Sequence, residues 1–204
     1  MKHLLLAAIL AVGTGLPAQA ANVSKSYSYF TITGKTLDEI ESQLMTRGPE
    51  VKSTGGRHPG ATQMEFTTRI GYSEVKGGCA IVSAHVTVKA KGILPRWRQS
   101  GKTAQEVRLI WDTLSADIKR HEESHVVIAK NHARELEQAL RAIGKNKTCQ
   151  AAAAEAKATS ERILSRHDRA QAEFDRIEGI NFESRIMRLL RYRLERIDAG
   201  KLKG

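Results

Sequence analysis

Residues 103–144 read TAQEVRLIWDTLSADIKRHEESHVVIAKNHARELEQALRAIG, and this stretch decides the fold because it predicts one long helix. Apolar residues at steps of four, three and four mark one face of it, namely Val107, Trp111, Leu114 and Ile118. The same spacing then reaches His121, His125, Ile128, His132 and Leu136. A capping box, Thr103-Ala-Gln-Glu106, is expected to start the helix, and Gly144 to stop it.

The middle of this helix carries an H-E-x-x-H motif, His121-Glu122-Glu123-Ser124-His125. Residues four apart lie nearly above one another on a helix, so the two imidazoles can converge on one tetrahedral Zn²⁺. Glu122 lies about a quarter-turn away, where it can reach a water on the metal. Zinc makes such a water acidic, and a carboxylate can take its proton during attack on a carbonyl. The motif also occurs by chance on solvated helices, but here both histidines fall on the apolar face.

A catalytic zinc usually has a third protein ligand. His132 lies seven residues beyond His125, roughly 10 Å along a continuous helix, which is too far for a shared metal. Glu178 and Asp175 stand just before Gly179, where a break between two later helices is expected, and we favour Glu178. His85 and His167 are further alternatives.

The chain before residue 103 favours strands. Residues 23–33, 62–72 and 79–90 alternate in a strand-like way, and the last has Ala80, Val82, Ala84, Val86 and Val88 on one face. Thr36-Leu-Asp-Glu39 predicts a short helix between the first two, and Gly92 to Pro95 is expected to end the third strand. The connections are short, which favours antiparallel pairing. The expected fold class is therefore α+β, a small antiparallel sheet packed against the long helix in a zincin-like arrangement.

Further helices are expected after Cys149. One runs from Ala151 to about Arg176, and an amphipathic helix with five arginines covers residues 182–197. We expect residues 21–180 to form the hydrolase domain and residues 181–204 a basic C-terminal helix.

The chain opens with features of a secretion signal: Lys2, an apolar run over residues 4–12, and Ala18-Gln19-Ala20. Residues 1–20 are thus expected to be removed, which places the protein in the periplasm or outside the cell, with no membrane-spanning segment in the mature form. In an oxidising compartment the two cysteines, Cys79 and Cys149, indicate one disulfide, with two free thiols as the alternative. The net charge of +11 suits contact with acidic surfaces, but no nucleic-acid-binding module is evident.

Taken in order, several segments resemble the domain-of-unknown-function 922 family, bacterial exported proteins described as predicted zinc-dependent proteases. They are Gly78-Cys79-Ala80-Ile81, Val86-Thr87-Val88, Leu94-Pro95-Arg96-Trp97, Trp111, the metal motif and Cys149. The resemblance implies zinc on His121 and His125, Glu122 as the base, and a Cys79–Cys149 pair. Such proteins often carry an aromatic-Asp segment followed by His-Gly. Here the stretch is Phe174-Asp175-Arg176-Ile177-Glu178-Gly179, so either Glu178 replaces a ligand or the site is altered.

Two functions follow from these features. The first is an exported zinc metallopeptidase acting on peptides or proteins, in which a strand such as residues 79–90 pairs with the substrate. The second is a non-catalytic envelope-binding protein with a structural or degenerate zinc site, docked on an anionic surface through residues 182–197.

Overall fold

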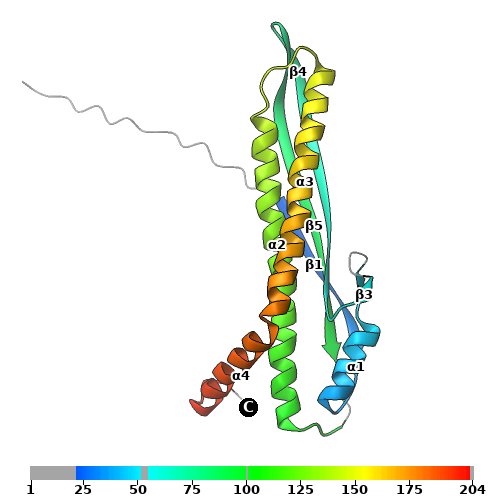
Figure 1. Cartoon of the computed structure of the whole chain (residues 1–204), viewed down its shortest axis with the longest axis vertical. Helices are drawn as coiled ribbons and strands as arrows, with labels where there is room; N and C mark the ends of the chain where they lie inside the picture. The colour runs from blue at the N-terminus through cyan, green and yellow to red at the C-terminus, as the bar shows by residue number, and fades with distance from the viewer. Residues whose placement is uncertain (1–21, 52–54, 100, 203–204) are drawn as a thin grey trace, which may run out of the picture.

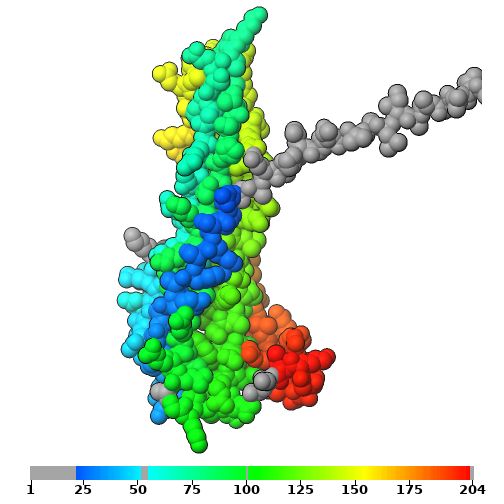
Figure 2. Space-filling model, turned by 180° about the vertical axis from the view of Figure 1, so that it is seen from behind, coloured from blue at the N-terminus to red at the C-terminus, as the bar shows by residue number. Residues whose placement is uncertain are grey.

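The computed structural model describes residues 22–51, 55–99 and 101–202, so the expected signal segment, residues 1–20, lies outside the described residues. The elements follow in the order β1 (Asn22–Ile32), α1 (Leu37–Arg47), β2 (Glu50–Val51), β3 (Gly56–Arg57), β4 (Ala61–Val75), β5 (Gly78–Trp97), α2 (Gln105–Arg141), α3 (Cys149–Ile180) and α4 (Phe182–Asp198). The α+β class is confirmed. Figure 1 shows an elongated molecule in which α2 and α3 run antiparallel along one face of the sheet. Figure 2 shows the reverse side, where β1 lies at the surface.

The main sheet is mixed, so the expectation of purely antiparallel pairing was wrong. Its strand order is β1-β5-β4. β4 and β5 form an antiparallel hairpin, whereas β1 pairs with β5 in parallel, from Asn22 opposite Thr87 to Ile32 opposite Trp97. Short connections favour antiparallel pairs only between strands that follow one another, and β1 pairs with a strand that comes later in the chain.

β5 also runs past Gly92 and Pro95, which were expected to end it. Pro95 pairs with Phe30 of β1, while β4 reaches only as far as Ile93. At Pro95, the side of β5 that faces β4 is therefore unpaired. Proline, which has no backbone N–H, is tolerated at an unpaired edge.

A bulge changes which side chains of β5 face the core. Gly71 pairs with Ser83 but Tyr72 pairs with Ile81, which leaves Val82 out of the ladder. Because side chains alternate along a strand, one extra residue moves the following ones to the other face. Val82 is accordingly 63% exposed, although the sequence placed it with the buried Ala84.

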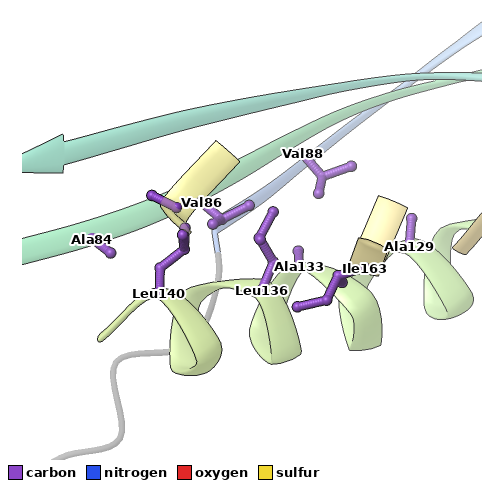
Figure 3. Packing of buried hydrophobic residues seen from close by; sticks show 9 residues of the cluster. Ala84, Val86, Val88, Ala129, Ala133, Leu136, Leu140 and Ile163 are labelled. Carbon is purple, nitrogen blue, oxygen red and sulfur yellow. The ribbon is translucent and has the colours of Figure 1, made fainter. Parts of the chain in front are cut away.

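The helices bury two clusters against the sheet. The larger joins β5, α2 and α3, and its buried members are Ala84, Val86, Val88, Ala129, Ala133, Leu136, Leu140, Ala156 and Ile163 (Figure 3). The alanines let the helices approach closely, and the larger side chains fill the space between them. The smaller cluster joins Ile32, Ile40, Leu44 and Trp111.

Helix ends followed the expected capping in one case of two. The box at Thr36 and Glu39 forms in full and starts α1. The box expected at Thr103 does not form, since α2 begins at Gln105 after Ala104 without a side-chain cap. α3 continues through Gly179, near which a break was expected, and ends at Ile180.

Side chains of α2 close the part of β5 that β1 does not reach. Glu137 accepts a hydrogen bond from the backbone N–H of Val86 at 2.9 Å, and Arg141 donates to the carbonyl of Ala84. Further along, Cys79 forms a disulfide with Cys149 at the start of α3, which confirms the predicted pair. Backbone groups of Val86 and Ala84 on this edge thus have partners, and the disulfide ties α3 to the same strand.

Candidate metal centre

The H-E-x-x-H motif lies between the two buried clusters of α2. Ile118 is buried on one side of the motif and Ala129 on the other. The last turns of α3 pass across it, so that Phe174 packs against both His121 and His125, with ring centroids 4.9 and 5.1 Å away. The two rings are thus held by packing on a rigid helix.

Three donor atoms converge at this point. Nε2 of His121 and Nε2 of His125 lie 3.1 Å apart, and Oδ1 of Asp175 lies 3.2 Å from the first and 3.1 Å from the second. The three residues form a group whose ligand atoms all lie within 4.8 Å of one another. Around a tetrahedral zinc with bonds of about 2.0–2.1 Å, donor atoms stand roughly 3.3 Å apart. The observed spacing fits that geometry.

The other nitrogen of each ring has its own partner. Nδ1 of His125 lies 2.6 Å from Oε1 of Gln171, so it donates its proton there and leaves Nε2 as a lone pair. Nδ1 of His121 lies 3.5 Å from Oε2 of Glu178. A partner on the far nitrogen is typical of metal-binding histidines, because it fixes the tautomer and the ring orientation. These partners of the two Nδ1 atoms favour a metal site independently of the spacing of the donor atoms.

Glu178, which the sequence favoured as third ligand, therefore lies on the wrong side of His121 for that role. Its carboxylate pairs with Arg120 and, at 3.3 Å, with Arg185 at the start of α4. These two guanidiniums hold the pKa of Glu178 below its ordinary value, against the opposing effect of burial. The structure brings Asp175, the second alternative, to the two Nε2 atoms instead.

Electrostatics keep the carboxylate of the donor group ionised. Burial alone would raise the pKa of Asp175, but its contacts with His121 and His125 hold that pKa well below its ordinary value. Burial would likewise lower the pKa of His125, yet the bonds to Asp175 and Gln171 outweigh it, so the pKa is raised. An anion between two rings attracts a positive charge, which a metal ion supplies.

Glu122 is buried beside the donor group, with 5% of its surface exposed. Thr62 of β4 donates its hydroxyl to Oε2 at 2.8 Å. Burial raises the pKa of Glu122, and the Thr62 bond only partly offsets this. Gly60 makes room for the carboxylate, because a Cβ there would stand 2.8 Å from Oε1. Glu122 is thus oriented by the sheet, beside the donor group.

The remaining histidines do not join the group. His132 bonds the carbonyl of Ile128 through Nδ1, and His85 is exposed on β5. His167 is buried, and its Nε2 lies 2.8 Å from Nε2 of Gln171. It therefore supports Gln171 rather than the metal group, and burial lowers its pKa.

Two clefts open at the centre, and each is lined by His121, Glu122 and Asp175 together with His58. The first, of about 390 Å³, also contacts β2 and residues 61–64 of β4. The second, of about 290 Å³, lies toward α4. The sequence analysis did not identify two residues of this site, His58 beside the clefts and Gln171 behind His125. Gln171 had a detectable signal, since it shares a helical face with Asp175 and Glu178, whereas His58 lies in a short connection with no pattern to mark it.

Within the described part of the chain, no helix combines the length and apolar character needed to cross a membrane. Comparison with curated proteins and with solved structures gave no match in either set. A family model, however, matches residues 27–183, which include every donor residue above as well as Gln171 and Glu178. The chain belongs to the family described as bacterial protein of unknown function (DUF922).

Proposed function

We propose that this protein is an exported zinc-dependent metallopeptidase, periplasmic or secreted, with His121, His125 and Asp175 as ligands. One observation carries the proposal: three donor atoms converge within 4.8 Å while the opposite nitrogen of each imidazole is engaged elsewhere. Zinc held there would polarise a substrate carbonyl and make water acidic. Export is inferred from the sequence of residues 1–20 and is consistent with the disulfide.

Glu122 is the proposed general base. Its carboxylate borders both clefts beside the donor group, and Thr62 fixes its direction. A carboxylate with a raised pKa can accept a proton from water and then return it to the leaving amine. Phe174 and Gln171 keep the imidazoles in place during that exchange.

The substrate backbone is proposed to bind along the outer edge of β4. β4 is the last strand of the sheet, and its residues 61–64 line the larger cleft. An extended peptide can add to such an edge through backbone hydrogen bonds. β5, which the sequence suggested for this role, lies between β1 and β4, and is therefore the less suitable strand.

The alternative of a non-catalytic docking protein has less support. Arg185 and Arg193 of α4 form ion pairs with α2, through Asp117 and Asp112. These arginines hold α4 against the body of the protein and are not free for an anionic surface. Two of the five arginines of α4 thus have a structural role.

The test is a comparison of zinc content and turnover in wild type, Glu122→Gln and Glu123→Gln. We expect about one zinc in each. Turnover of a denatured protein mixture, followed by mass spectrometry of new termini, should fall roughly 10²–10⁴-fold in Glu122→Gln. Glu123 is the matched control because it faces Tyr27 and Lys25 instead. Undiminished cleavage by Glu122→Gln, or absence of zinc from wild type, would refute the proposal.

A further inference from the structure

The smaller of the two clefts extends from the metal centre toward the junction of α3 and α4. It shares His121, Glu122 and Asp175 with the larger cleft, so a ligand group in it would lie next to the donor atoms. Its volume is about 290 Å³. That is room for one large side chain.

Part of the wall of this cleft is apolar. Its apolar lining residues are Pro59 of the connection before β4, Ile118 of α2 and Phe182 of α4. Phe182 is 45% exposed although it stands at the start of a helix that packs on α2. An aromatic side chain that borders a cleft and remains half open to solvent has surface available for a ligand.

Asp117, Glu178 and Arg185, which line the α4 end of the cleft, are held in ion pairs. Arg185 lies 3.1 Å from Oδ2 of Asp117 and 3.3 Å from Oε2 of Glu178. Arg120 pairs with the same two carboxylates from the neighbouring turn of α2. Two guanidiniums thus face two carboxylates, and a charged side chain entering the cleft would find no unpaired opposite charge among them.

We propose that this cleft is a substrate subsite that selects a large apolar side chain next to the scissile bond, with Phe182 and Ile118 as its contact surfaces. The assignment of the bound group to a peptide rests on the proposed function. It also gives α4 a role in specificity, since Phe182 is the first residue of that helix.

Two hydroxamates of different size test the subsite in zinc-loaded protein without requiring turnover. Acetohydroxamate and 3-phenylpropanohydroxamate share the metal-binding group, and only the second carries a side chain for the cleft. We expect calorimetry to show the phenyl compound binding at least about tenfold more tightly to wild type. The advantage should fall below about threefold in Phe182→Ala and remain in Met187→Ala, a control on the exposed surface of α4. Equal affinities in wild type, or an advantage that survives in Phe182→Ala, would overturn the subsite.

A metal-independent measurement separates this inference from the proposed function. In metal-free protein, 3-phenylpropanamide should shift the methyl NMR signals of Ile118 in wild type but not in Phe182→Ala. Signals that do not move would overturn the subsite even if zinc binds and peptides are cleaved. Absence of zinc, or of Glu122-dependent turnover, would overturn the metallopeptidase proposal while a positive NMR result left the apolar cleft standing.

Discussion

Replacing Gln171 by leucine should weaken zinc binding roughly 10- to 100-fold, although Gln171 is not a proposed ligand. Its amide oxygen receives Nδ1–H of His125 at 2.6 Å, and its amide nitrogen donates to the His125 carbonyl at 3.1 Å. Leucine has a similar size but supplies neither bond, so nothing would fix the tautomer that leaves Nε2 free. Loss of a partner behind a metal-binding histidine typically has this cost in affinity, equal to about 1.4–2.7 kcal/mol.

The assay is competition for zinc against a chelator of known affinity, with two companion variants. Gln171→Glu retains an acceptor for His125 and should bind zinc at least as well as wild type. Gln138→Leu makes the same change at an exposed position of α2 and should have no effect. Urea unfolding of the metal-free proteins checks that folding is intact, since lost buried bonds also reduce stability by about 1–3 kcal/mol. An unchanged zinc dissociation constant in folded Gln171→Leu would refute the reasoning.

Three other predictions address the ligand set, the disulfide and a surface carboxylate. Asp175→Ala should lose zinc on dialysis, whereas Glu178→Ala should retain it with reduced affinity; metal analysis showing the reverse would return Glu178 to the ligand role. Alanine at both cysteines should lower the unfolding free energy by about 4 kcal/mol, because the disulfide spans 70 residues, and urea titration would expose a negligible effect. The Tyr27 hydroxyl, 2.5 Å from Glu123, is the main cause of that carboxyl's lowered pKa, so Tyr27→Phe should raise it. The stability that the Tyr27–Glu123 bond gives the folded protein is fully present above the pKa of Glu123 in the unfolded chain. It is lost as the pH falls through the lower pKa of Glu123 in the folded protein. NMR titration with Tyr29→Phe as control would contradict this if both variants matched wild type.

Local patterns in the sequence predicted most elements because their causes are local. The apolar spacing from Val107 to Leu136 lies on one continuous helix, as expected. The capping box at Thr36 formed because its two bonds join residues three positions apart. The similar pattern at Thr103 failed, since Arg108 bonds the Thr103 carbonyl and the helix begins one residue later than such a cap requires.

Features that depend on distant residues were not predictable in the same way. The parallel pairing of β1 with β5 brings together residues about 65 positions apart, and no alternation within either strand encodes its direction. The bulge at Val82 depends on how Gly71 and Tyr72 of the partner strand are aligned. Pro95 is acceptable in β5 only because β4 ends its pairing at Ile93.

The third donor residue shows most clearly the difference between what local patterns predict and what distant residues decide. Asp175 and Glu178 are three residues apart on one helix, so sequence places both near the metal motif but cannot say which faces the two Nε2 atoms. The partners of Glu178 decide this, because Arg120 comes from α2 and Arg185 from α4, and together they draw that carboxylate behind His121. Asp175 has the shorter side chain and no such arginine pair, and its Oδ1 lies about equally far from both Nε2 atoms. The aspartate of the aromatic-Asp segment therefore completes the group of three donor atoms, and Glu178 lies beside the opposite nitrogen of His121.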